Sequence, residues 1–123
     1  MTWQEVFVLH GSRRGIRVDQ NHASLLLDFG LSVYHNRRES GFLFYEGEGK
    51  SGDQNPTKGN AALLECLEIK RPVLVLERSQ PGIWRNAGEH LVVDVEYLKL
   101  EAQQRYVFVF KLKPLQYSAL HNV

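Results

Sequence analysis

The chain has 123 residues, enough for one domain with its own hydrophobic core. Hydrophobic residues make up 43% of it and charged residues 24%, and no apolar run approaches the ~20 residues that a membrane helix needs. The net charge of +1 excludes a polycation that coats nucleic acid without specificity, but it permits a local basic face. The single cysteine, Cys66, excludes an intrachain disulfide and a multi-cysteine zinc site. The chain does not open with the basic and then apolar segment of a signal peptide, so we expect a cytoplasmic location.

Two helices are predicted, one near the N-terminus and one in the middle of the chain. The segment Thr2–Glu5 has the form of a capping box, which favours a short helix over residues 3–9, although the apolar part of this stretch also suits a strand. The second helix is expected over residues 60–69, with Thr57 or Asn60 as its N-cap.

Five segments have the apolar, β-branched or aromatic content of strands: residues 25–29, 41–45, 73–76, 89–100 and 106–112. Residues 11–15 form a basic, glycine-bounded loop, and Pro81-Gly82 marks a turn. The loop from Glu46 to Gly59 is long for a compact domain, and loops of that length often carry function. The tail after Pro114 is expected to fray.

The most informative stretch joins an aromatic strand end to a glycine-rich loop and then to a helix. It reads Tyr45-Glu46-Gly47-Glu48-Gly49, then Asp53-Gln54, then Thr57, Asn60, Ala62 and Leu63. This ordered set resembles the signature of the SRA (SET- and RING-associated) family, in particular the SRA-like domains fused to HNH nucleases in bacterial modification-dependent restriction enzymes. The segments Gly11–Ile16 and Pro72–Val75 fit the same family, so the resemblance covers roughly residues 3 to 113.

The resemblance implies an α+β fold: a PUA/SRA-like curved, partly closed, mostly antiparallel β-barrel with one or two flanking helices. It implies a single DNA-binding domain over residues 1–123, with residues 114–123 as the frayed tail. The implied partner is double-stranded DNA that carries modified cytosine, in a bacterial cytoplasm. The base would be flipped out of the duplex, at a cost of a few kcal/mol that stacking and hydrogen bonds must offset.

The implied base pocket needs flat walls and a polar group that reads the base edge. Tyr34 and Tyr45 stand at the family's two aromatic positions. Asn36 occupies a position where the family commonly has Asp, so either Asn36 or Asp28 is expected to read the edge. Phe29 and Gly30 would border the group on carbon 5, and the sequence leaves open whether that group is methyl, hydroxymethyl or a larger one.

Two further sets of residues follow from the same reading. The pocket is expected to be supported by Glu46, Gly47, Gly49, Asp53, Gln54 and Asn60. Phosphate or groove contacts are expected from the cations of three loops, Arg13, Arg14, Arg37, Arg38, Lys50 and Lys58.

Catalytic chemistry is not predicted for this chain. Its acidic loop residues and scattered histidines match no metal-ligand spacing, so we expect no metal, no cofactor and no catalytic residue. Cleavage would belong to an HNH-type nuclease domain in cis. Two alternatives remain open: a PUA- or ASCH-like domain that binds RNA or a nucleotide, and a small metal-dependent enzyme that uses Asp53 or Asp28.

Overall fold

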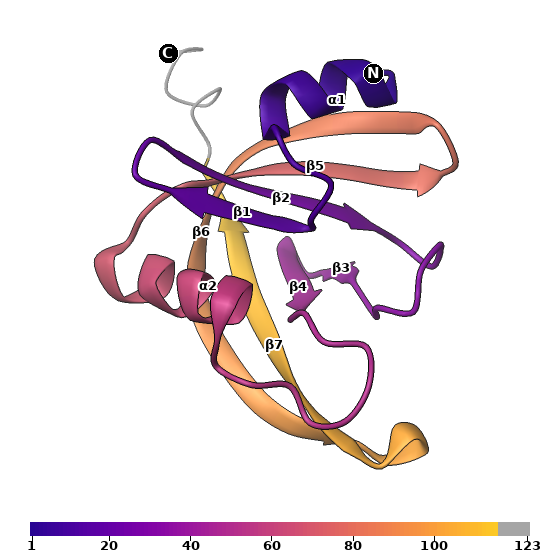
Figure 1. The fold of residues 1–123 in the computed structure, drawn as a ribbon, viewed down its shortest axis with the longest axis vertical. Coiled ribbons are helices and arrows are strands. Elements are labelled where there is room, and N and C mark those ends of the chain that lie inside the picture. Colours follow the sequence, from indigo (N-terminus) through magenta and orange to yellow (C-terminus); the bar gives the residue numbers. More distant parts are fainter. Residues whose placement is uncertain (116–123) are drawn as a thin grey trace.

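The computed structural model describes residues 1–115, which form two α-helices, a short 3-10 helix and a seven-stranded sheet (Figure 1). In chain order the elements are α1 (Trp3–His10), β1 (Ile16–Asp19), β2 (His22–Asp28), β3 (Arg37–Glu39), β4 (Phe42–Glu46), α2 (Lys58–Ile69), β5 (Val73–Gln80), β6 (Ile83–Leu100), η1 (Glu101–Gln103) and β7 (Arg105–Pro114). Neither α-helix of this described part has the length and hydropathy needed to cross a bilayer.

The N-terminal helix α1 forms because both of its ends are capped. The Glu5 N–H donates to Thr2 Oγ1 (3.2 Å) and the Thr2 N–H donates to Glu5 Oε1 (2.9 Å), as the capping box predicts. At the other end Gly11 has a left-handed φ of 72°, and its N–H donates to the Phe7 carbonyl. The prediction of a helix is therefore confirmed, and Val6 packs it onto β5 and β6.

The structure contains the five predicted strands and two that the sequence does not predict, β1 and β3. Both are short and lie at the two ends of the sheet, where a strand needs little apolar content. β5 and β6 also extend toward the predicted Pro81-Gly82 turn, so β6 begins at Ile83 and not at Glu89.

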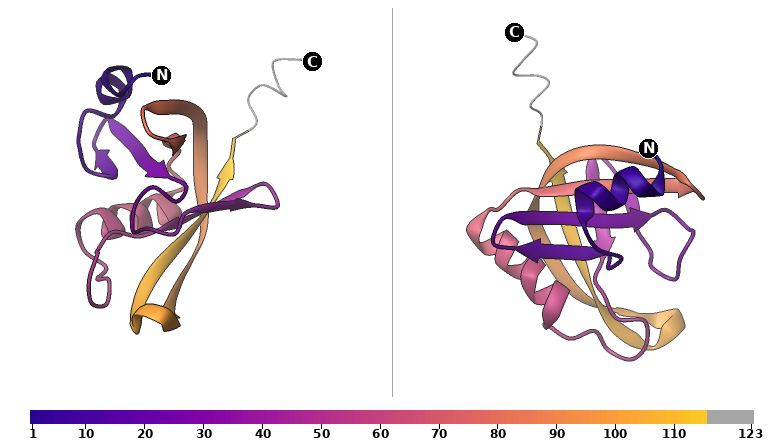
Figure 2. Two further views of the ribbon diagram at one scale, coloured as in Figure 1. Left: turned by 90° about the vertical axis from the view of Figure 1, so that its right-hand side faces the viewer. Right: turned by 45° about the horizontal axis from the view of Figure 1, so that its top comes forward.

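The order of strands in the sheet is β1-β2-β5-β6-β7-β4-β3, and β2 with β5 is the one parallel pair among the described strands. β1 and β3 end the ladder without pairing to each other, so the sheet is not closed. The structure supports the implied curved, mostly antiparallel fold, and the implied partial closure only as a bend of the sheet. The sheet is nevertheless strongly bent. Both α-helices and the β1–β2 hairpin lie on the same side of the long β6–β7 ribbon (Figure 2).

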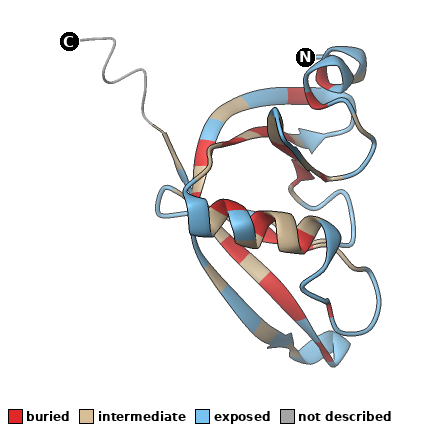
Figure 3. Ribbon diagram, turned by 60° about the vertical axis from the view of Figure 1, so that its left-hand side comes forward, coloured by how far each residue is buried: buried red, intermediate tan, exposed pale blue. Residues whose placement is uncertain are grey.

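Helix α2 covers the sheet with one face and leaves its other face in solvent (Figure 3). Leu63 and Cys66 of the covered face are buried in the main core with the inward-facing residues of β4 and β7. Burial raises the pKa of the Cys66 thiol.

The end of the sheet includes part of the predicted tail. Pro114 belongs to β7, and the Leu115 N–H donates to the Glu89 carbonyl. The rest of that predicted tail, residues 116–123, lies outside the described residues.

Candidate functional site

The Asn36 side chain joins the ends of β2 and β4. Its Nδ2 donates to the Asp28 carbonyl (3.1 Å), and its Oδ1 accepts from the Glu46 N–H (3.0 Å). These bonds use one of the two amide hydrogens and one of the two carbonyl lone pairs. The amide is therefore oriented by the backbone of both strands and keeps one donor and one acceptor for a ligand.

The loop of residues 29–36 is shaped by Asp28. Its Oδ1 accepts from the N–H groups of Leu31 and Ser32, both at 3.0 Å, which folds the chain back after β2. Gly30 lies inside this turn with a φ of 89°, a value that favours glycine. The Asp28 carboxylate is thus engaged in holding the loop that carries Tyr34.

The two tyrosines occupy different environments. Tyr34 is half-buried, and its hydroxyl accepts from the Gly49 N–H (3.3 Å). Tyr45 is only 6% exposed and faces the core on β4, where it pairs in register with Phe110 of β7. Burial raises the pKa of the Tyr45 hydroxyl far above its usual value. Gly15 lies against that hydroxyl, because a Cβ on Gly15 would be 3.1 Å from it.

Gln54 holds the glycine-rich loop of residues 47–57 against β7. Its Nε2 donates to the carbonyls of Gly47 (2.6 Å) and Gly49 (3.2 Å), and its Oε1 accepts from the Phe108 N–H (2.9 Å). Asp53 adds a second link, since its Oδ1 accepts from the Tyr106 N–H (2.8 Å). The loop is therefore pinned by side chains that the sequence analysis assigned to pocket support.

Of the two predicted N-cap candidates, Thr57 takes the N-cap position, whereas Asn60 lies inside the first turn of α2. Its Oδ1 accepts from the Glu48 N–H (2.8 Å), and its Nδ2 donates to the carbonyls of Glu48 and Asn55 (3.0 Å each). Thr57 is the N-cap residue, but its side chain accepts no capping bond. Glu48 Oε1 instead accepts from the Gly59 N–H (2.6 Å), so a carboxylate of this chain occupies the positive end of the helix.

A buried ion pair lies beneath the two loops. Glu46 Oε2 is 3.5 Å from Arg105 Nη2, and both side chains are less than a tenth exposed. Glu46 Oε1 accepts from the His35 N–H (3.0 Å), while Arg105 Nη2 donates to the Gly49 carbonyl (2.6 Å). The pair therefore ties the loop carrying Tyr34 to the glycine-rich loop.

The sequence does not predict that Arg105 belongs to the site, because a lone arginine is usually exposed to solvent. One feature of the sequence does indicate that Arg105 is buried. Arg105 lies on the same face of β7 as Val107 and Val109, and an apolar face of this kind is usually turned away from solvent.

An open cleft of 420 Å³ lies between Tyr34 and the glycine-rich loop. Three of the predicted cations line it: Arg14, Lys50 and Lys58. Glu48, Asp53, Gln54 and Asn60 line it as well. Of the predicted base-pocket residues only Tyr34 lines it, whereas its lining does not include Tyr45, Asn36, Asp28, Phe29 or Gly30. The structure thus gathers most of the predicted support residues and half of the predicted cations around Tyr34.

The other three predicted cations lie elsewhere. Arg13 borders a shallow hollow beside Trp3 on α1. Arg37 stacks on Phe44 at 4.2 Å, and Arg38 forms an ion pair with Glu77 inside the bent sheet. None of the three lines the Tyr34 cleft.

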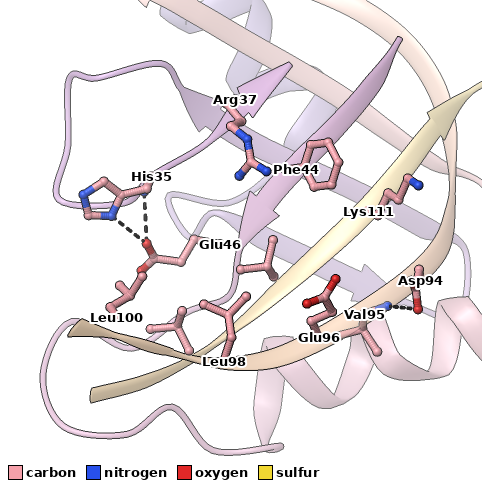
Figure 4. Close-up of a pocket in the computed structure, with 12 residues that line it drawn as sticks. His35, Arg37, Phe44, Glu46, Asp94, Val95, Glu96, Leu98, Leu100 and Lys111 are labelled. Carbon is pink, nitrogen blue, oxygen red and sulfur yellow. Dashed lines mark hydrogen bonds and ion pairs between the residues drawn. The ribbon is translucent and has the colours of Figure 1, made fainter. Parts of the chain in front are cut away.

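A second cavity, of 280 Å³, opens on the opposite face of β4, β6 and β7 (Figure 4). Its apolar lining includes Phe44, Leu98 and Leu100, with Glu46 and His35 at one end. This cavity is separate from the Tyr34 cleft, because no residue that lines one also lines the other. Glu46 and Tyr45 are consecutive residues of β4, so their side chains point to opposite faces, and Glu46 belongs to the face with this cavity.

The two metal-binding candidates of the sequence, Asp28 and Asp53, are not gathered with further potential ligands in residues 1–115. Within this described part, no three histidine, cysteine or acidic side chains gather so as to hold a metal ion. Asp28 and Asp53, the two candidates for metal binding, are engaged with backbone N–H groups of their own surroundings.

Comparison with known proteins identifies the family. The family model described as "ScoMcrA-like, SRA domain" matches residues 28–121. The chain belongs to the SRA family. The resemblance predicted from the glycine-rich motif is confirmed, while a search of curated protein sequences gives no match.

Solved structures of other SRA proteins share this fold. The SUVH5 SRA domain in complex with fully methylated CG DNA is 26% identical with a TM-score of 0.77, and the match covers 94% of this chain and 85% of that one. The same domain bound to fully hydroxymethylated CG DNA is 24% identical with a TM-score of 0.80 and the same coverage. The modification-dependent TagI restriction endonuclease is 22% identical with a TM-score of 0.78, and all of this chain matches 51% of that enzyme.

Proposed function

We propose that this SRA domain recognises modified cytosine in double-stranded DNA by base flipping, as the specificity domain of a modification-dependent restriction system. The observation that carries the proposal is the cation-lined cleft beside Tyr34. Asn36, two residues further along the same loop, has its side-chain amide oriented by the backbone of β2 and β4. The SUVH5 complexes support modified DNA as the ligand, and the likeness in fold to TagI supports the restriction context.

The flipped base is held by stacking and by its polar edge. Tyr34 is the outer wall, on a loop fixed by Asp28 and Glu46, and Tyr45 is the inner wall. Each stacked aromatic contributes ~1–3 kcal/mol. Asn36 has one lone pair for the exocyclic amine of cytosine and one hydrogen for the ring nitrogen. Phe29, together with Gly30, borders the group on carbon 5.

The DNA backbone runs over the cleft. Arg14 comes from the loop before β1, and Lys50 and Lys58 flank the glycine-rich loop, so phosphates are contacted from two sides of the extruded nucleotide. Cleavage belongs to a nuclease domain of HNH type in cis, in the bacterial cytoplasm.

The test is binding of one short duplex that carries unmodified, 5-methyl, 5-hydroxymethyl or glucosylated cytosine at fixed salt. Tyr34→Ala is compared with Tyr106→Ala, because Tyr106 is 41% exposed and stacks on Tyr97 but does not line the cleft. We expect preference for one modified duplex, retained in Tyr106→Ala and reduced roughly 5- to 150-fold in Tyr34→Ala, the equivalent of one stacked base.

A base analogue that fluoresces when unstacked, placed opposite the target cytosine, reports flipping in the same titration. Equal binding of all four duplexes, or stronger binding of an RNA of the same sequence, would reject the proposal. The second result would favour the RNA-binding alternative.

A further inference from the structure

The N-terminal part of the chain contributes to the cleft although it lies outside the family match. That match begins at Asp28, whereas Arg14 lines the cleft and Gly15 lies against the Tyr45 hydroxyl. Both come from the loop of residues 11–15, which contains no helix or strand of its own. The position of Arg14 therefore depends on whatever fixes this loop.

His10, the last residue of α1, makes the central contact to that loop. It is completely buried, and its Nε2 lies 2.6 Å from the Arg14 carbonyl. Its Nδ1 lies 2.5 Å from Ser24 Oγ on β2, and Ser24 Oγ lies 2.6 Å from His22 Nε2. The imidazole thus bridges α1, the loop and the sheet.

The Arg14 carbonyl fixes the donor and the acceptor of every hydrogen bond in the row that links Arg14, His10, Ser24 and His22. The Arg14 carbonyl can only accept, so His10 Nε2 must carry a hydrogen. In the neutral ring Nδ1 then accepts from the Ser24 hydroxyl, and Ser24 accepts from His22 Nε2–H. A doubly protonated His10 would donate from Nδ1 to Ser24 Oγ, and the Ser24 hydroxyl would then have to turn its hydrogen away from His10.

We infer that His10 is a positioning residue for DNA binding, which fixes the loop of residues 11–15 so that Arg14 faces the cleft and Gly15 supports Tyr45. This inference rests on the proposed function. Two further bonds hold the loop ends, from Arg17 Nη1 to the His10 carbonyl (2.7 Å) and from the Leu26 N–H to the Gly15 carbonyl (2.7 Å). Between these ends His10 Nε2 is the contact that reaches the Arg14 backbone from α1.

The charges around His10 favour the neutral ring that this arrangement requires. Burial lowers the pKa of His10, and although its bond to the Arg14 carbonyl opposes this, the nearby His22 and Arg17 lower it further. Around His22, Asp19 is paired with Arg17, and Arg71 lies close enough to oppose a positive charge on that ring as well. Above the ordinary histidine pKa the His10 ring is therefore neutral and the hydrogen-bond chain is complete.

The test is the salt dependence of binding to the preferred modified duplex. His10→Phe keeps the volume and removes both bonds, and His10→Gln keeps a side-chain donor that can reach the Arg14 carbonyl. We expect His10→Phe to lose roughly tenfold in affinity and ~0.9 in the slope of log K against log salt, the contribution of one phosphate contact. Arg14→Ala should lose the same, and the double variant no more than either, because both changes remove one contact. His10→Gln should recover most of the affinity.

His90→Phe is the matched control, since His90 is equally buried but lies away from the loop, and its salt slope should equal that of the wild type. All variants are compared below their measured melting temperatures. If His10→Phe kept the wild-type salt slope while Arg14→Ala lowered it, the inference would be overturned and the proposed function would stand. Additive losses in the double variant would overturn it too. Absence of preference for modified cytosine in the wild type would instead reject the proposed function.

Discussion

The two fully buried histidines of the described chain lie next to arginines, with opposite consequences for each arginine. His10 binds the backbone carbonyl of Arg14 and leaves its guanidinium to line the cleft. His90 Nε2 accepts from the guanidinium of Arg38, which also donates to Glu77, while His90 Nδ1 donates to the Gly88 carbonyl (3.0 Å). The first arrangement presents a positive charge to a ligand, and the second neutralises one inside the fold.

The second arrangement has a structural task. Arg38 on β3 contacts Glu77 on β5 and His90 on β6, although β3 is not next to either strand in the ladder. The ionic cluster of Arg38, Glu77, Arg85 and His90 therefore ties the free edge of the sheet to its centre. On the proposed function, a basic residue near the site is available to DNA only where the fold leaves its charge unpaired.

The largest effect that separates the two regions is expected in Glu77→Ala. Glu77 is 6% exposed and accepts from both Arg38 and Arg85, so its removal leaves the half-buried Arg38 beside His90 without an anion. Breaking a buried pair costs ~3–5 kcal/mol, and partial exposure of the arginines puts the expected loss at ~2–3 kcal/mol. Urea unfolding measures it.

Glu39→Ala is the control, because Glu39 forms an exposed pair with Arg37 and should cost at most ~0.5 kcal/mol. The salt slope of DNA binding should stay unchanged in Glu77→Ala. If stability held and the slope fell, the cluster would belong to the DNA interface and the comparison would fail.

The next effect is a common dependence of stability on pH. Burial lowers the pKa of His10 and of His90 below the ordinary value of 6.5. The folded state thus binds fewer protons than the unfolded state, and the stability that each neutral ring contributes is complete above 6.5 and declines as the pH falls toward the folded pKa.

Unfolding free energies between about pH 7.5 and 5.5 test this, since that window spans the ordinary pKa of histidine. The decline should be smaller in His10→Phe and smaller again when His90→Phe is added. If the loss of stability at low pH were as large in the double variant as in the wild type, other titrating groups would be its cause. DNA binding separates the two residues, because the salt slope should respond to His10 alone.

Single alanine variants of the cleft cations give a smaller effect. Arg14→Ala, Lys50→Ala and Lys58→Ala should each lower the salt slope by ~0.9 with little change in stability, since these side chains are exposed and line the cleft. Arg38→Ala should lower stability and leave the slope unchanged. A reversed pattern would show that the DNA backbone follows the Arg38 side of the sheet.

The sequence predicts those parts of the site whose signal is local. The capping box of α1, the aromatic strand ending at Tyr45 and the glycine-rich loop after it are each encoded within a few residues, and the family resemblance follows from their order. Gln54 could be placed beside the pocket for the same reason. Its bond to the Phe108 N–H could not, because that contact joins residues 54 positions apart.

The parts that resist prediction depend on which strands pair. The apolar face that Arg105 shares with Val107 and Val109 is a local signal of its burial, but no local pattern records that Glu46 and the glycine-rich loop are its partners. Because the sequence does not predict β3, Arg37 and Arg38 are assigned to a basic loop. Once β3 pairs with β4, successive side chains must point to opposite faces, so one arginine stacks on Phe44 and the other enters the bent sheet.

The smallest expected effect, in Arg37→Ala, tests that alternation directly. Arg37 pairs with Glu39 at the surface and stacks on Phe44 on the face away from the Tyr34 cleft. Its loss should cost no more than ~1 kcal/mol, the value of an exposed ion pair with a cation–π contact, and should leave both the affinity for the modified duplex and its salt slope unchanged. Lys50→Ala, equally exposed but in the cleft, is the matched comparison. If Arg37→Ala lowered the salt slope as much as Lys50→Ala, the DNA would contact both faces of the sheet. The duplex could do so only by wrapping around the sheet edge at β3.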